Sequence, residues 1–426
     1  MSSLKQKTVT GLIWSFIDSI AGSGIQFIIG IILARLLSPR EFGLIGMIMV
    51  FIAISESFIN SGFSSALIRK KNCTDRDYST VFIFNLIVGL IFVLLLQITA
   101  KPISLFFDEP ELKNILKVFS LVLIIDSISL IQRTILTKRV DFKLQAKISV
   151  FASIASGIVS ISLAYYGFGV WSLVFQRVSK QVVNSALLWI WNKWRPKLIF
   201  CKESFKELFG FGSKLLLSGL IDTLYRNIYY LIIGKFFSAS DLGYYTRANE
   251  FRSLPSQHLN GIIGKVSYPI LSSIQDDTQR LKLNYTRLIR STMFITFILM
   301  MGMAATSESM IIVLIGEQWR ESIIYLQMLC FVGMMYPLHA LNLNMLQVQG
   351  RSDLFLKLEI IKKIIAIPTI IIGIYWGIKI MIIGMMVNTL VAYYLNSYWS
   401  GKMLNYSFGQ QIKDILPSFL LALTMG

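Results

Sequence analysis

The sequence predicts an all-α integral membrane protein in which one helical unit is used twice. Hydrophobic residues make up 54% of the 426 positions and charged residues 15%, and the mean hydropathy is +0.64. Apolar stretches of about 20 residues recur along the chain, which is the length that crosses roughly 30 Å of hydrocarbon. The segment Leu37–Gly43 returns 200 positions later as Phe237–Gly243. Together these observations exclude an ordinary soluble domain.

Twelve membrane-spanning helices are expected where the apolar stretches begin and end. In chain order they cover residues 10–33, 42–65, 79–100, 114–132, 148–165, 170–190, 211–236, 242–268, 288–309, 323–346, 356–376 and 380–400. The first follows the short basic segment Met1–Val9, which has no small-residue cleavage site, so we expect a retained helix and not a signal peptide. A further apolar stretch begins at Ile415, and we expect a truncated thirteenth helix there, with one or two more spans after it.

The distribution of Lys and Arg predicts the orientation of these helices. With the N-terminus in the cytoplasm, the inside segments hold 28 of these residues and the outside segments hold 8. Such a bias is typical of bacterial membrane proteins, because cationic loops are retained on the cytoplasmic side. We therefore expect a multi-pass protein with a cytoplasmic N-terminus.

The repeat predicts how the helices are grouped. The connection at about 191–210 is the longest cytoplasmic one and separates two sets of six helices. Because six is even, both sets enter the membrane from the same side, and the repeat is parallel, with a pseudo-twofold axis along the membrane normal. The expected lobes are residues 1–200 and 201–405, and residues 406–426 begin the additional helix.

The repeated segments have the spacing of helix caps. Ser38-Pro39-Arg40-Glu41 matches a capping box, in which the Ser38 hydroxyl accepts from a backbone N–H three residues on and Glu41 reaches back. Ser238-x-x-Asp241 offers a weaker version of the same arrangement. We expect these segments to cap helices at the outer surface and not to form the transport site.

Charge and composition exclude several classes of site. The net charge of +18 is explained by the cationic loops and does not require a nucleic-acid partner. Three Cys without a CxxC pair and two His support neither a zinc site nor a disulfide framework. There is no GxxxxGK[ST] loop, so ATP hydrolysis and a bound cofactor are not expected.

Ionisable residues within the expected spans are the candidates for function, because they are costly in lipid and usually face a cavity or a partner. The plainer interpretation of any single one is an interfacial position or a structural pair, as for Asp222 and Arg226, four residues apart on one helix. Several Arg and Lys around one cavity would bind an anion such as phosphate. The cationic candidates for substrate binding are Arg177, Lys180, Arg226, Arg247 and Arg252, and the carboxylate candidates for ion coupling are Asp18, Glu56 and Glu250.

The motifs resemble those of a transporter family. The segments Gly11–Ser15, Ala34–Gly43 and Leu242–Ala248, with Leu254-Pro255, are similar to the Wzx-type polysaccharide transporters, colanic-acid branch, of the MOP flippase superfamily. The resemblance implies two six-helix lobes around a cavity that opens alternately to each side. It also implies an undecaprenyl-diphosphate-linked oligosaccharide as substrate, a bacterial inner membrane, and polysaccharide polymerase machinery as a partner.

Two other functions stay open at this stage. A cation-coupled multidrug antiporter of the related MATE type predicts a cavity dominated by carboxylates, whereas this sequence offers Arg and Lys at least as often. A membrane glycan polymerase or ligase usually carries a large outside loop, and no outside loop here exceeds about 15 residues. The sequence therefore favours a transporter over an enzyme.

Overall fold

The computed structural model describes residues 2–60 and 62–425; of these, the side chains of 2–13, 15–19, 257–266, 268–270 and 352 are outside the description. The described chain is helical, with no strand among these residues. It divides into two compact units, Met1–Gly243 and Tyr244–Gly426.

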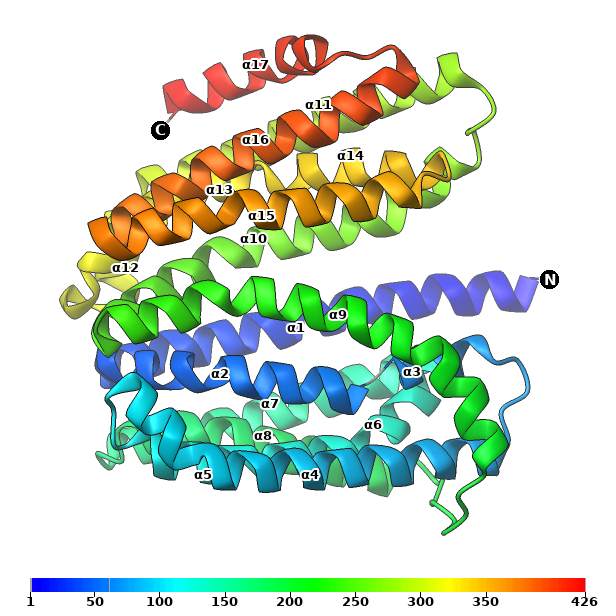
Figure 1. The fold of residues 1–426 in the computed structure, drawn as a ribbon, viewed down its shortest axis with the longest axis vertical. Helices are drawn as coiled ribbons and strands as arrows, with labels where there is room; N and C mark the ends of the chain where they lie inside the picture. The colour runs from blue at the N-terminus through cyan, green and yellow to red at the C-terminus, as the bar shows by residue number, and fades with distance from the viewer. Residues whose placement is uncertain (1, 61, 426) are drawn as a thin grey trace. The chain divides into compact units, whose positions relative to one another are not determined.

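The first unit is a bundle of helices (Figure 1). Its helices are α1 (Ser2–Leu36), α2 (Pro39–Asn60), α3 (Phe63–Arg69), α4 (Asp75–Phe107), α5 (Leu112–Ser120), α6 (Val122–Lys138), α7 (Phe142–Tyr165), α8 (Val170–Trp191) and α9 (Lys202–Phe236), followed by the start of α10 (Ala239–Ser272). Within this unit α8 packs against α7, α6 and α2, and α9 packs against α2 and α4.

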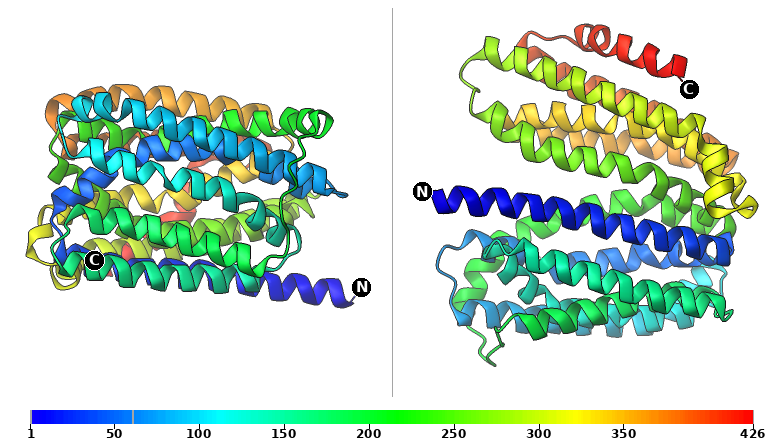
Figure 2. Two further views of the ribbon diagram at one scale, coloured as in Figure 1. Left: turned by 90° about the horizontal axis from the view of Figure 1, so that it is seen from below. Right: turned by 180° about the vertical axis from the view of Figure 1, so that it is seen from behind.

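The second unit begins within α10 and is also helical. It continues through α11 (Thr278–Ala305), α12 (Ser307–Ile315), the 3-10 turn η1 (Glu317–Trp319), α13 (Glu321–Met334), α14 (Tyr336–Val348), α15 (Ser352–Trp376), α16 (Ile378–Leu404) and α17 (Phe408–Met425). Helices α11, α13, α14, α16 and α17 pack on one another, and Figure 2 shows them from two further sides.

Each of the twelve expected spans coincides with one helix or with two consecutive helices, and α17 covers the expected thirteenth. Four expected spans are broken in two, including the one at 42–65, where Gly62 separates α2 from α3. Gly62, the residue before α3, has a φ of +68°, a left-handed conformation that glycine adopts readily and that does not occur within an α-helix. In the described part of the chain, seven helical segments are long and apolar enough to cross a membrane by length and composition. The expected division at residue 200 stays a prediction.

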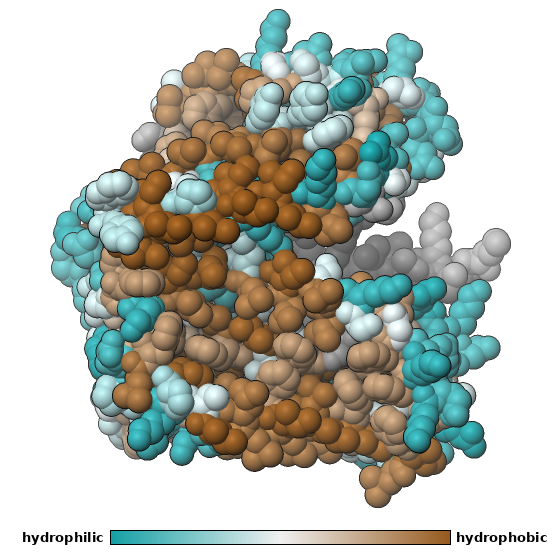
Figure 3. Space-filling model, in the orientation of Figure 1, coloured by the Kyte–Doolittle hydropathy of each residue, from teal (hydrophilic) through white to brown (hydrophobic). Residues whose placement is uncertain are grey.

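The surface exposes the large apolar side chains that contact with lipid requires. On α4, the large apolar side chains Leu90, Ile91, Leu94, Leu95 and Ile98 are exposed. On the face of Figure 3, hydrophobic residues cover the middle of the first unit's helices and hydrophilic residues gather near the helix ends. A soluble protein rarely exposes an apolar patch of this extent, whereas a membrane protein requires one.

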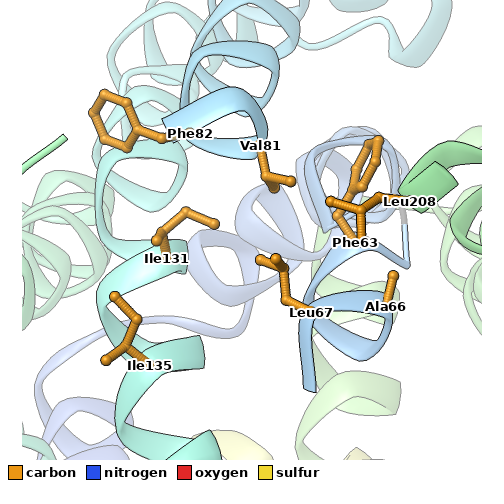
Figure 4. Close-up of a cluster of buried hydrophobic side chains, with 8 residues drawn as sticks. All are labelled: Phe63, Ala66, Leu67, Val81, Phe82, Ile131, Ile135 and Leu208. Atoms are coloured by element: carbon orange, nitrogen blue, oxygen red, sulfur yellow. The ribbon is translucent and has the colours of Figure 1, made fainter. Parts of the chain in front are cut away.

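A cluster of buried apolar side chains fixes the rotation of α6 (Figure 4). The cluster is formed by Phe63, Ala66, Leu67, Val81, Phe82, Ile131, Ile135 and Leu208 from α3, α4, α6 and α9. Ile131 and Ile135 are four residues apart, so they anchor one face of α6. The other face, which carries Asp126, Ser129 and Arg133, is thereby directed at the cavity described below.

The repeated segments lie against each other within the first unit. A Cβ on Gly43 would lie 1.7 Å from the carbonyl oxygen of Ala239, and a Cβ on Gly243 would lie 1.9 Å from that of Pro39. The contact is reciprocal, because Pro39 and Ala239 occupy equivalent positions of the repeat, as do Gly43 and Gly243. Only glycine permits two backbones to approach this closely.

Both repeated segments cap helices, and the second is the more complete box. Ser238 N–H donates to Asp241 Oδ2 (3.2 Å), and Asp241 N–H donates to Ser238 Oγ (3.0 Å). In the first segment Ser38 N–H donates to Glu41 Oε2 (2.6 Å). The Ser38 hydroxyl was expected to accept from the backbone N–H of Glu41, but it donates to Glu41 Oε2 (3.0 Å), and that N–H bonds the Ser38 carbonyl instead. The expectation that the second segment is the weaker cap was therefore wrong.

Candidate functional site: a cationic cavity in the first unit

A cavity of about 400 Å³ lies inside the first unit, between α2, α6, α7 and α8. Its charged lining consists of Glu56 from α2, Asp126 and Arg133 from α6, and Arg177 and Lys180 from α8. Three cationic side chains thus face two carboxylates. This excess of positive charge favours an anionic ligand.

Helix α8 supplies the polar face of the cavity. Arg177, Lys180, Gln181 and Asn184 all line it, and their spacing of three, four and seven residues places them on one face of a helix. Gln181 and Asn184 are buried at 7% and 9% exposure. The opposite face of α8 carries apolar residues, so the helix holds its polar stripe toward the cavity and away from lipid.

The two carboxylates of the cavity have different partners. Arg177 Nη2 donates to Glu56 Oε1 at 3.0 Å, and both side chains are partly exposed. Asp126 accepts from Gln181 Nε2, which also donates to Ser129 Oγ at 3.2 Å. Glu56 is therefore held by a charged group and Asp126 by a neutral one.

Two donors on the α8 face lack a partner among the described residues. They are Arg177 Nε and Asn184 Nδ2, and both atoms are buried. Buried polar atoms are usually hydrogen-bonded, and an unpaired one calls for an explanation such as a ligand. The cavity thus offers donors for an oxygen-rich anion, and the described residues hold no group of three or more potential metal ligands.

The expected site residues fall into separate places. Glu56, Arg177 and Lys180 are brought together in the cavity. Arg226 lies elsewhere on α9, exposed and paired with Asp222 at 2.8 Å, which confirms the expected ion pair. Asp18 lies in α1, but its side chain is outside the described residues.

The remaining candidates belong to the second unit. Arg247 is buried and pairs with Glu250 on the same helix at 2.6 Å. Arg252 is 7% exposed, donates from Nη2 to Asn249 Oδ1 at 2.5 Å, and lies over the Tyr336 ring at 5.2 Å. Its Nε and Nη1 have no hydrogen-bond partner in the part of the chain that the structure describes.

Several polar residues of the cavity were not among the expected site residues, among them Asp126, Arg133, Gln181 and Asn184. Asp126 is an ionisable residue within the expected span at 114–132, whereas Arg133 comes directly after that span. Gln181 and Asn184 are uncharged and do not stand out in composition. The signal that could have found them is the helical spacing from Arg177 and Lys180, which continues through both positions.

The fold is shared with transporters of known structure. The chain superposes on a lipid II flippase (MurJ, inward closed conformation) with a TM-score of 0.76 and 17% identity, over 98% of this chain and 91% of that one. It superposes on an inward-facing multidrug resistance MATE family transporter of the MOP superfamily with a TM-score of 0.69 and 16% identity, over 91% and 96%. The helices and the internal polar cavity thus define an all-α membrane protein of the MOP transporter fold.

The family is shown by sequence. Residues 32–324, more than half of the chain, match the family described as Polysaccharide biosynthesis protein, and the chain belongs to that family. It is 26% identical to the lipopolysaccharide biosynthesis protein WzxC of Escherichia coli (strain K12), over 99% of this chain and 86% of that protein. The resemblance to Wzx-type transporters is thereby confirmed, and the structural neighbours belong to the expected class, transporters and not enzymes.

Proposed function

We propose that the protein is a flippase that moves undecaprenyl-diphosphate-linked oligosaccharide units across the bacterial inner membrane by alternating access. The family's role in polysaccharide biosynthesis supports a glycan precursor. The fold shared with a lipid II flippase supports a lipid-linked one. The protein would work beside the polysaccharide polymerase machinery, with its N-terminus in the cytoplasm.

The observation that carries this proposal is the cationic cavity. A diphosphate needs several donors and a compensating positive charge, and Arg can bind phosphate with two hydrogen bonds at once. Arg177, Lys180 and Arg133 supply three positive charges around one space of about 400 Å³. We infer that the diphosphate binds there while the isoprenoid tail stays in the bilayer.

The residues outside this cavity complete the proposal. The lobes 1–200 and 201–405 would move relative to each other during transport, and Arg226, Arg247 and Arg252 would contact the substrate in other steps. Asp18 and Glu250, together with Glu56 inside the cavity, are the proposed positions for coupling to an ion. The buried Arg252, with two donors unpaired in the described part of its unit, is the strongest of the cationic candidates in the second unit.

Reconstitution into proteoliposomes with a fluorescent lipid-linked oligosaccharide tests the proposal through leaflet exchange. Arg177→Gln and Lys180→Gln should each slow exchange by about tenfold to a hundredfold, because a hydrogen bond to a charged group contributes about 1.5–3 kcal/mol. The matched control is Lys379→Gln, which removes a cation near the start of α16, outside the cavity. Equal rates for all variants and the parent would refute the cationic site.

A cation-coupled multidrug antiporter is the second candidate function. It is favoured by the MATE-type structural neighbour and by the two carboxylates Glu56 and Asp126 in the cavity. This alternative predicts that the reconstituted protein exports an organic cation such as ethidium and does not exchange the lipid-linked oligosaccharide. A glycan polymerase or ligase would instead elongate the glycan in the same vesicles.

A further inference from the structure

We propose that Glu56 acts as an internal counter-ion, which neutralises Arg177 in the empty cavity and is displaced by the phosphate of the incoming substrate. This inference rests on the proposed function, because it describes how the same cavity takes up and releases an anion. It starts from the one ion pair between cavity-lining residues of different helices, Arg177 Nη2 with Glu56 Oε1 at 3.0 Å, in the described part of the chain.

The geometry of the pair leaves Arg177 incompletely bound. A guanidinium carries five N–H donors in a planar arrangement and can hold an anion through two parallel hydrogen bonds. Glu56 receives one hydrogen bond, from Nη2. Arg177 Nε is buried and has no partner within the described residues. A phosphate that accepts from both Nε and Nη2 would therefore satisfy the donor that Glu56 leaves unpaired.

The other carboxylate is not available for the same exchange. Asp126 accepts from Gln181, and the same amide donates to Ser129, which fixes both groups on α6 and α8. Glu56 comes from α2 and makes its hydrogen bond to Arg177 only, among the residues that the structure describes. Glu56 can swing away from Arg177 without breaking another hydrogen bond. Departure of Asp126 would instead take one of two acceptors from the buried Gln181 amide, which would keep only Ser129.

The exchange would serve both binding and release. While the cavity is empty, Glu56 lowers the cost of keeping the Arg177 charge in a partly buried site. After transport, Glu56 competes with the phosphate for Arg177 and promotes departure of the substrate. A site without this competitor would bind the diphosphate more tightly and release it more slowly.

The test measures binding of farnesyl diphosphate to the full chain in nanodiscs and compares four variants. Glu56→Gln removes the competing charge at nearly constant shape, Glu56→Asp keeps the charge, Arg177→Gln removes the anion ligand, and Glu317→Gln is a matched control in an exposed pair with Arg320. We expect Glu56→Gln to lower the Kd by about threefold to tenfold, because a partly exposed ion pair contributes modestly. Glu56→Asp and Glu317→Gln should bind as the parent does, and Arg177→Gln should bind at least tenfold more weakly.

The outcomes separate this inference from the proposed function. If Arg177→Gln loses binding but Glu56→Gln binds no tighter than the parent, the counter-ion role is wrong and the cationic site stands. If Glu56→Gln binds more weakly, Glu56 positions Arg177 and does not compete for it, which also overturns the inference. If Arg177→Gln binds as the parent does, the proposed anion site itself fails. If Glu56→Gln binds farnesyl diphosphate more tightly and also moves substrate between leaflets more slowly at saturating substrate, the result would support displacement of Glu56 by the phosphate.

Discussion

At the residue scale, Gly43 and Gly243 are two positions where a side chain would collide with backbone. Each lies in a repeated segment, and each meets the backbone of the other segment at a distance that a Cβ could not occupy. The repetition in the sequence is therefore explained by a contact between the two copies. The spacing of Ser and acidic residues predicts the two helix caps. It does not predict that the two caps are in contact, because 200 residues separate them in the chain.

Replacement of Gly43 by Ala should destabilise the protein by about 1–3 kcal/mol, since the backbones of two helix starts would have to separate. Thermal unfolding of the purified full chain in detergent measures the effect. Gly302→Ala is the matched control, because a Cβ there meets nothing within 4 Å and Ala favours the helix. An unchanged midpoint for Gly43→Ala would contradict the close contact.

At the element scale, the polar face of α8, which carries Arg177, Lys180, Gln181 and Asn184, shows what the sequence could and could not predict. Helix positions followed from hydropathy, and Arg177 and Lys180 followed from their charge within an expected span. The cavity partners on α2 and α6 could not be derived, because the packing of distant helices is not encoded in local periodicity. Arg226 shows the converse: its charge marked it as a candidate, yet the structure places it outside the cavity, beside Asp222.

The cap of α10 provides the prediction at this scale. Asp241→Ala removes the acceptor of the Ser238 N–H and hydroxyl, and loss of such a cap costs about 1 kcal/mol. Amide hydrogen exchange at residues 238–245 should therefore become about fivefold faster through local opening. Asp276→Ala serves as the control, since that carboxylate follows the end of α10 and caps no helix. Equal exchange in both variants would mean that the cap does not hold the helix start.

At the scale of the whole molecule, the helices and the family are established, and the orientation in the membrane is a prediction that the charge distribution carries. If the chain were inserted the other way, the 28 Lys and Arg of the expected inside segments would lie outside, and only 8 would lie in the cytoplasm. Such a distribution is the opposite of what bacterial membrane proteins show. Both repeated caps would then also lie on the cytoplasmic side. The direction of transport depends on this orientation, because a precursor assembled in the cytoplasm must enter from the inside.

Single cysteines decide the orientation, provided that Cys73 and Cys201 are first replaced by Ser and Cys330 stays buried. Lys113→Cys lies on α5 in an expected outside segment, and Lys71→Cys lies in an expected inside segment; both positions are exposed. An impermeant maleimide added to intact spheroplasts should label the Lys113→Cys variant and leave the Lys71→Cys variant unlabelled. Both should react after the membrane is permeabilised, which controls for accessibility. The reverse pattern in intact spheroplasts would contradict the expected orientation and place the N-terminus outside.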